Sequence, residues 1–429
     1  MKKLLILILI ALSFCFAFSS NYFTAHLLFD YRASFKTNPE ILFAENLINL
    51  HIAGRPVNSM RITADADILI YPDSLLSNKR AFHQFRINEL YACIFNFPIK
   101  QTDSRVGIQR INHDYSETMG TMDNLNAYDQ TDRWSFDNRI PDFSASTIYY
   151  NGKFTLGLDI LPFFSPHNLP ASDISVYEMP SFIKISDINE TISMPEGSGE
   201  NINISVFSEY RFTSADIKLH YQYTREKTQW PDTIVITQDN APWIINIDSR
   251  FYYPRINLMG LSIASSLYDA GFNGSIAFIV PERTSFIMDM TDLGRGVVDS
   301  GLTDRSFYIK GDLGVDYTFP NGFYMDISYH RGLYYEYGIN IHNYIFLSLR
   351  MPLFNDRLII MPLNTGIELS SFNDWKNNAA YSLMPDIRYK PMNNLTMGIK
   401  AFLTGGGDNT YFSKNRDYSG IGLYLMADF

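Results

Sequence analysis

Apolar residues recur at every second position along most of this chain, which is the period of a β-strand with one apolar face. Ile202, Ile204 and Val206 alternate with Asn, Asn and Ser neighbours, and the last segment alternates in the same way up to Phe429. After the N-terminal residues, no segment reaches the run of about eighteen apolar residues that an α-helical membrane span requires. The alternation therefore predicts an all-β chain.

Connection lengths also alternate between short and long along the sequence. Several short connections carry turn residues, such as Tyr-Asn-Gly at 150–152 and Pro-Asn-Gly at 320–322. The predicted short connections are 98–103, 151–152, 213–215, 253–255, 281–283, 320–322 and 352–356. The predicted long loops are about 112–142, 164–200, 226–242, 291–304 and 404–418.

This regular order is typical of a transmembrane antiparallel up-and-down β-barrel, whose periplasmic turns are short and whose external loops are long. A Greek-key sandwich has no reason to produce it. We expect about eighteen strands, within a range of roughly sixteen to twenty. The number is twenty if the weak pair 272–280 and 284–290 belongs to the wall, and eighteen if that pair lies in an external loop.

Composition agrees with a membrane barrel and excludes one class of partner. Charged residues make up 19% of the 429 residues and aromatic residues 15%. Amphipathic rings are enriched where a barrel crosses the membrane interfaces. The formal net charge of −10 does not suit electrostatic binding of nucleic acid, so no nucleic-acid partner is expected.

The N-terminus predicts export, and together with the barrel pattern this indicates the outer membrane of a Gram-negative bacterium. Lys2 and Lys3 precede an apolar run at 4–18, and Ala17 and Ser19 have the spacing of a signal-peptidase site. We expect a cleaved signal peptide at 1–19 and a single barrel domain at 20–429. The expected partners are the lipid bilayer, lipopolysaccharide, and the barrel-assembly machinery, which would engage the C-terminal strand ending in Phe429.

The predicted inner face of the barrel carries charges of both signs. A Lys or Arg facing lipid at the bilayer midplane costs about 2–4 kcal/mol, so alternation assigns these side chains to the lumen; Glu89 breaks the pattern and predicts a bulge or a rim position. The predicted pore-lining residues are Arg61, Asp65, Asp67, Arg86, Arg105, Gln109, Lys153, Asp159, Glu209, Arg211, Asp216, Lys218, Asp248, Arg250, Lys310, Asp312, Asp316, Asp326, Arg350 and Lys400.

Two interpretations of these charges stay open from the sequence. Opposed acidic and basic side chains form a constriction that selects polar solutes, or they pair across strands and line a plugged interior. The first predicts a porin-like channel for passive diffusion of small hydrophilic solutes. The alternative is a plugged structural or adhesive barrel that acts through its external loops.

The loop at 112–142 is a candidate for narrowing the pore. It is acidic, and it either folds into the barrel and narrows it or forms an external surface that binds divalent cations between lipopolysaccharide-rich neighbours. The residues that would form a constriction are Asp129, Asp132, Arg133, Asp137 and Arg139.

Catalytic and metal-binding motifs are absent from the sequence. Its eight histidines are scattered, no His-Glu-x-x-His occurs, and no Cys/His cluster has the spacing of a zinc site. No enzyme activity, no metal and no cofactor are therefore expected.

One local segment resembles a known group of channels. The strand Arg105-Val-Gly-Ile-Gln-Arg110 and the loop end Trp134-Ser-Phe-Asp-Asn-Arg139 are similar to alginate-export-like porins and related substrate-specific outer-membrane channels. These often place an Arg-x-Gly-Arg-Gln strand just before a pore-restricting loop, and Ile108 replaces the second Arg of that pattern here. The resemblance covers about 35 residues and implies a monomeric channel of roughly eighteen strands, without implying a substrate.

Overall fold

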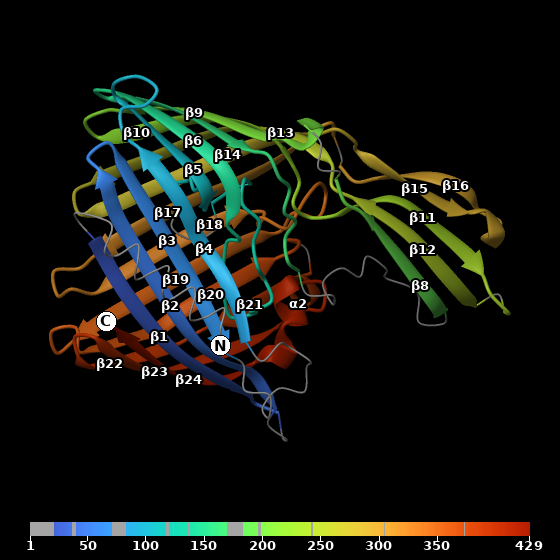
Figure 1. Ribbon diagram of the computed structural model, residues 1–429. Coiled ribbons are helices and arrows are strands. Elements are labelled where there is room, and N and C mark those ends of the chain that lie inside the picture. Colours follow the sequence, from blue (N-terminus) through green and yellow to red (C-terminus); the bar gives the residue numbers. More distant parts are fainter. Residues whose placement is uncertain are drawn as a thin grey trace.

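A computed structural model shows a closed β-barrel with a second, smaller sheet attached to it (Figure 1). The residues that it describes are 21–36, 40–70, 83–116, 120–122, 124–135, 138–169, 183–195, 199–241, 243–303, 305–372 and 374–429. The predicted signal peptide at 1–19 lies outside the described residues.

The barrel wall has eighteen antiparallel strands, as the sequence predicts. β21 and β22 count as one wall strand because both pair with β20 and β23, and the barrel closes where β1 pairs with β24. The wall consists of β1 (Asn21–Ser34), β2 (Ile41–Val57), β3 (Met60–Ile70), β4 (His83–Ile94), β5 (Thr102–Gln109), β6 (Asp142–Asn151), β7 (Phe154–Leu161), β9 (Asn203–Arg211), β10 (Ala215–Arg225), β13 (Arg255–Leu267), β14 (Ala270–Pro281), β17 (Tyr308–Thr318), β18 (Tyr324–Arg331), β19 (Asn343–Leu353), β20 (Leu358–Leu369), β21 (Ala379–Leu383), β22 (Asp386–Met392), β23 (Leu395–Gly406) and β24 (Gly420–Asp428).

The two faces of the wall differ as the alternation predicts. In β9, Asn203 and Ser205 are completely buried on the inner side, whereas Ile204 and Val206 are 37% and 38% exposed on the outer side. Apolar side chains that remain exposed on one face of a closed barrel need an apolar solvent, which is the lipid.

The connections at one end of the barrel are short, and we call this the turn end. Gly152 and Gly322 lie in two of these turns with positive φ angles of 60° and 84°, which favour glycine. Tyr268 and Asp269 form another short connection, between β13 and β14. The opposite end, which we call the loop end, carries the long connections.

The second sheet projects from the loop end and has five strands (Figure 1). Its strands are β8 (Lys184–Ser193), β11 (Trp230–Gln238), β12 (Ile244–Tyr252), β15 (Ser285–Met290) and β16 (Gly296–Gly301). They come from three different long connections, and β12–β8 and β11–β15 are parallel pairs. We call this unit the extension sheet.

The extension sheet corrects the predicted order of the wall strands. The segment 243–252 alternates like a wall strand but forms β12 of the extension sheet, and 284–290 lies in the same sheet as β15. The segment 272–280, in contrast, belongs to wall strand β14. The predicted turns at 253–255 and 281–283 are therefore at the loop end, because each joins an extension strand to a wall strand.

A bulge in β4 explains the irregular position of Glu89. Asp65 pairs with Glu89, and the next residue, Ala66, pairs with Ile87, so Asn88 is the extra residue. An extra residue shifts the alternation by one position. Leu90 then faces outward, being 46% exposed, and Glu89 faces the interior.

Helices are short and lie outside the wall. They are α2 (Trp375–Asn378), α3 (Tyr411–Lys414), η2 (Gly199–Asn201), η3 (Thr291–Leu293) and η4 (Arg416–Tyr418). None of the helices in the described part of the chain combines the length and apolarity needed to cross a bilayer.

Candidate functional site

The connection between β5 and β6, residues 110–141, folds into the barrel, and we call it the inner loop. Its backbone is bound by wall side chains on one side, where Lys218 Nζ donates to His113 O over 2.8 Å and Gln222 Nε2 donates to Met122 O over 2.6 Å. On another wall segment, Asp132 of the loop binds Arg32 of β1. A loop held by both β10 and β1 spans the lumen, so the first of the two interpretations of this loop is correct.

The contact with β1 is a buried charge cluster. The Arg32 guanidinium binds Asp132 of the inner loop, with an Nη2–Oδ2 distance of 2.9 Å, and Asp30 of its own strand at 2.7 Å. Lys400 of β23 donates to the same Asp30 carboxylate over 2.7 Å. Trp134 covers the cluster, and the Arg32 guanidinium carbon lies 4.8 Å from its ring centroid. Asp30 and Arg32 are not among the predicted pore-lining residues, although they alternate with Phe29 and Tyr31, which are exposed on the outer face.

The predicted constriction residues mostly anchor the inner loop. Arg133 is buried and donates to Tyr411 Oη over 3.1 Å, and Arg139 is buried with its guanidinium carbon 5.5 Å from the Tyr128 ring. Asp129 accepts hydrogen bonds from Thr131 and Asn168. Asp132 binds the wall, and Asp137 lies outside the described residues.

The predicted pore-lining residues fall into four groups by position. Asp67, Gln109, Asp159, Glu209, Lys218, Lys310 and Asp312 are buried on the inner face. Asp65, Arg86, Asp216, Asp316, Asp326 and Lys400 are partly buried wall residues. Arg61, Arg105, Arg211 and Arg350 are exposed wall residues, and Lys153 is exposed in the turn between β6 and β7. Asp248 and Arg250 lie in the extension sheet, outside the barrel, because β12 is not a wall strand.

Many of the buried charges on the inner face are paired. His113 Nε2 lies 2.6 Å from Asp159 Oδ2, and Lys218 Nζ lies 3.4 Å from Glu209 Oε2. Arg86 binds Asp67 at 2.6 Å. The His113–Asp159 pair joins the inner loop to the wall, whereas the other two pairs join neighbouring wall strands.

Among the described residues, two of the larger cavities inside the barrel share one lining residue, Asn364 of β20. The first has a volume of about 310 Å³ and is lined by Asp30, Trp134, Asp386, Arg388, Lys400 and Tyr424, among others. The second has a volume of about 370 Å³, lies nearer the turn end, and is lined by Tyr115, Ser116, Asp316, Tyr324 and Asp326, among others. Both linings mix charged, hydroxyl and aromatic groups.

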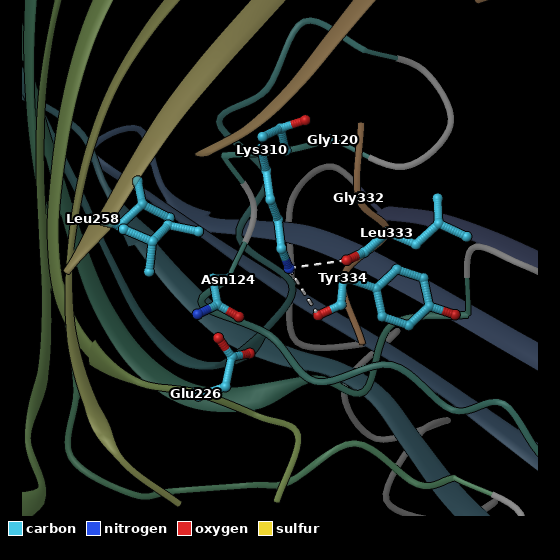
Figure 2. A pocket seen from close by; sticks show the side chains of 10 residues that line it. Gly120, Asn124, Glu226, Leu258, Lys310, Gly332, Leu333 and Tyr334 are labelled. Atoms are coloured by element: carbon cyan, nitrogen blue, oxygen red, sulfur yellow. Dashed lines mark hydrogen bonds between the residues drawn. The ribbon is translucent and has the colours of Figure 1, made fainter. Parts of the chain in front are cut away.

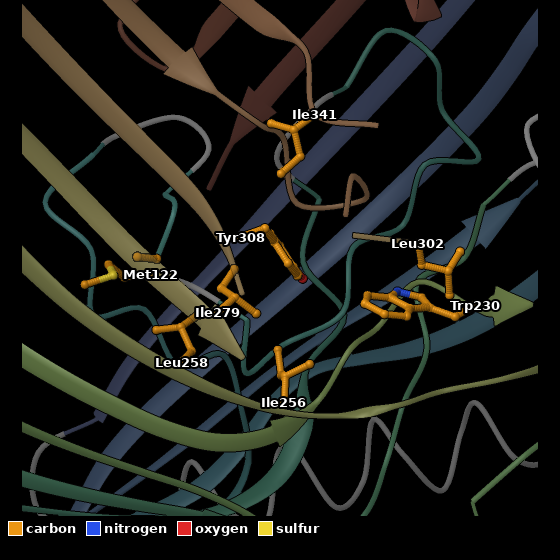
Figure 3. Close-up of a cluster of buried hydrophobic side chains, with 9 residues drawn as sticks. Met122, Trp230, Ile256, Leu258, Ile279, Leu302, Tyr308 and Ile341 are labelled. Carbon is orange, nitrogen blue, oxygen red and sulfur yellow. The ribbon is translucent and has the colours of Figure 1, made fainter. Parts of the chain in front are cut away.

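An apolar cluster fills part of the lumen at the loop end (Figure 3). Ile256 and Leu258 of β13 point inward, and Met122 of the inner loop and Trp230 pack with them. The inner face therefore carries apolar side chains here as well as the predicted charges. The sequence carries an indication of this, since Leu258-Met259-Gly260-Leu261 has no polar side chain at either inward or outward positions.

Lys310 is buried beside this cluster and holds the loop between β18 and β19 (Figure 2). Its Nζ donates to Leu333 O over 2.9 Å and to Tyr334 O over 3.4 Å. Glu226 lies in the same region and accepts a hydrogen bond from Tyr308 Oη over 3.0 Å. Burial raises the pKa of the Glu226 carboxyl. The cavity between these groups has a volume of only about 10 Å³.

A second polar cluster joins the loop end of β20 to two loops. His342 Nδ1 lies 2.7 Å from Glu368 Oε1 and 3.4 Å from Glu336 Oε1. Glu368 accepts the backbone N–H groups of Tyr411 and Phe412, each at 2.7 Å. Burial lowers the pKa of His342, but the hydrogen bond to Glu368 and the charge of Glu336 outweigh burial and raise its pKa.

Raising the pH from about 6 to about 9 is expected to loosen this cluster. A histidine whose pKa is raised by folding stabilises the protein below its unfolded pKa of about 6.5, and that contribution disappears as the pH rises through its folded pKa. Thermal unfolding of the refolded barrel should therefore begin at lower temperature at alkaline pH, and His342→Gln should reduce this dependence. Identical pH profiles for the two proteins would contradict the assignment.

Solved structures share this fold over nearly the whole chain. OpdK of Pseudomonas aeruginosa, an outer membrane protein solved with vanillate, matches with a TM-score of 0.54 and 10% sequence identity, over 96% of this chain and 99% of that chain. OccK9 (OpdG) of the same organism matches with a TM-score of 0.53 and 10% identity, over 96% and 98%. OccK2 (OpdF), solved with glucuronate, matches with a TM-score of 0.52 and 8% identity, over 96% and 98%.

At these identities the similarity shows the fold alone. No protein-family model matches the chain, and no curated protein matches it either. The closed wall with its apolar outer face, in a fold shared with outer-membrane proteins, identifies the chain as an outer-membrane β-barrel.

Proposed function

We propose that this protein is a porin-like channel through which small hydrophilic solutes diffuse passively across the outer membrane. The observation that carries the proposal is the pair of polar cavities inside the barrel, both lined by Asn364. An inner loop that narrows the lumen without filling it gives a route limited by solute size and charge. Vanillate and glucuronate, found with two proteins of the same fold, support small organic anions as first solutes to test.

Asn364→Trp is expected to slow solute entry several-fold. The larger side chain would narrow both cavities at once, because Asn364 lines each of them. Liposomes containing the refolded protein, swelling in glucuronate or in a neutral pentose, measure the entry rate. Leu363→Trp is the matched control, since Leu363 is 40% exposed on the outer face and should leave swelling unchanged. Equal swelling rates for Asn364→Trp and Leu363→Trp would show that solutes do not pass through these cavities.

The second candidate is a plugged structural or adhesive barrel that acts through its external loops. Two observations favour it: the apolar cluster at the loop end of the lumen and the extension sheet built from three external connections. This candidate predicts liposomes that do not swell in any small solute, although the barrel is folded and inserted.

Two further partners are expected for a barrel in the outer membrane. We infer that lipopolysaccharide surrounds the loop end and that the barrel-assembly machinery binds the C-terminal strand. In support, Phe429 closes the barrel by exchanging backbone hydrogen bonds with Ala25 over 2.8 and 3.0 Å.

A further inference from the structure

Two carboxyl groups from distant parts of the sequence meet where the inner loop touches the wall. Asp114 belongs to the inner loop, and Asp312 lies on the inner face of β17. Ser275 of β14 lies between them, because its Oγ is 3.5 Å from Asp114 Oδ2 and also hydrogen-bonds to Asp312 Oδ2. Both carboxyl groups therefore converge on one hydroxyl.

This pair of carboxyl groups forms no ion pair with a basic side chain in the described residues, although Lys218 and His330 interact with Asp114 through space. Asp312 is 3% exposed, and within the described residues no Lys, Arg or His forms an ion pair with Asp312 or Asp114. His330 lies opposite Asp312 in the β17–β18 register, but its Nε2 binds Ser328. Lys218 acts on Asp114 through space, yet its Nζ contacts Glu209 and His113 O.

Backbone contacts favour ionised carboxylates at this position. Asp114 accepts the N–H groups of Met122 at 2.9 Å and Ser116 at 3.2 Å. Asp312 accepts the N–H of Thr121 at 3.4 Å. Such bonds stabilise the charged form, whereas burial and the neighbouring carboxyl group disfavour it. A cation between the two carboxylates would remove this conflict.

One buried oxygen atom of this pair lacks a partner. Asp312 is 3% exposed, and its Oδ1 has no hydrogen-bond partner of ordinary geometry, although the hydroxyl of Thr121, a residue that is 8% exposed, interacts with the same carboxyl group. Buried polar atoms are nearly always satisfied, by water or an ion if not by protein. Carboxylate and hydroxyl oxygens are hard ligands, which Ca²⁺ prefers over the nitrogen and sulfur ligands of transition metals.

We propose that a divalent cation of the Ca²⁺ type binds between Asp114 and Asp312, with the Ser275 and Thr121 hydroxyls and water completing its coordination. It attaches the inner loop to the β14–β17 wall, as Arg32 attaches the loop to β1. The cavity of about 370 Å³ gives access, because its lining includes Ser116, two residues after Asp114, and Gly314, two residues after Asp312.

The sequence analysis predicts no metal because these ligands come from three separate segments. No group of three or more His, Cys, Asp or Glu side chains in the described residues is arranged to hold a metal ion. This site has two carboxylates and takes its other ligands from hydroxyls and water.

Calorimetric titration with CaCl₂ tests the proposal. The full-length mature protein is refolded in detergent without lipopolysaccharide and treated with EDTA before the titration. We expect one saturable site and a rise in Tm on adding Ca²⁺. Asp312→Asn and Asp114→Asn should each weaken binding at least tenfold and remove the rise in Tm. Asp316→Asn is the matched control on the same strand and face, and it should bind Ca²⁺ like the unchanged protein.

Ser275→Ala provides a variant that keeps both carboxylates if an Asn variant does not fold, and it should bind Ca²⁺ several-fold more weakly. Absence of saturable binding would overturn the proposal. Binding that neither Asn variant nor Ser275→Ala changes would also overturn it, by placing the ion on the outer surface. A Tm that rises in the Asn variants without Ca²⁺ would show a proton shared by the two carboxyl groups instead.

Discussion

Replacing Arg32 with methionine is expected to lower the free energy of unfolding by about 3–5 kcal/mol, the usual cost of removing one partner from a buried ion pair. The Arg32 side chain is 5% exposed and lies between the carboxylates of Asp30 and Asp132. Asp30 keeps its contact with Lys400 at 2.7 Å, but Asp132 would lose its positive partner on the wall. The inner loop should then detach from β1.

Arg211→Met is the matched control. Arg211 also binds a carboxylate, Glu209, at 2.8 Å, but its side chain is 57% exposed. Exposed pairs contribute about 0–1 kcal/mol. Denaturant unfolding of the two variants, refolded in the same detergent and followed by tryptophan fluorescence, measures the difference. Equal stability of both variants would show that the Arg32 cluster does not hold the loop.

Trp230→Ala is expected to destabilise the loop end by about 3–5 kcal/mol, as large-to-small substitutions of buried aromatic residues do. Trp230 is completely buried, and its ring stacks on Tyr337 with 4.5 Å between centroids. Its removal would leave a cavity in the apolar cluster of Figure 3, between the inner loop, the β18–β19 connection and the base of the extension sheet.

Trp243→Ala supplies the comparison, because Trp243 lies in the extension sheet connection and is 55% exposed. Its loss should change stability by no more than about 0.5 kcal/mol. The denaturant midpoints of unfolding of the two variants measure this difference in stability. A Trp230→Ala protein as stable as Trp243→Ala would mean that the apolar cluster does not contribute to the fold.

Local sequence patterns predicted the wall strands well, because the alternation of apolar and polar residues within each strand shows which face contacts lipid. The alternation of Ile204 and Val206 with buried polar residues, and the Asn-Gly turns at 151–152 and 321–322, are decided within a few residues. The irregular position of Glu89 could therefore be predicted from the sequence. The predicted number of eighteen strands is also correct, although it counts 243–252 in the wall in place of 272–280.

The strands of the extension sheet could not be distinguished from wall strands by their local sequence pattern. β12 alternates Ile245 and Ile247 with polar residues, as a wall strand does, because one face of each sheet is apolar in both cases. Only the pairing partners differ, and β12 pairs with β8 and β11 rather than with wall strands. Asp248 and Arg250 were assigned to the lumen for this reason.

The interior depends on contacts between residues far apart in the chain, which periodicity does not record. The pairing of Arg32 with Asp132 and the packing of Met122 against Ile256 both require the inner loop to enter the barrel. The sequence left this open for 112–142, since an acidic loop suits an external surface as well as a lumen.

Single-channel recording in a planar lipid bilayer tests the central claim most directly. The refolded mature protein is expected to give stable, discrete conductance steps, and Asn364→Trp should reduce the step size while Leu363→Trp leaves it unchanged. A barrel that inserts into the bilayer and stays electrically silent would contradict the channel and favour the plugged, loop-acting barrel.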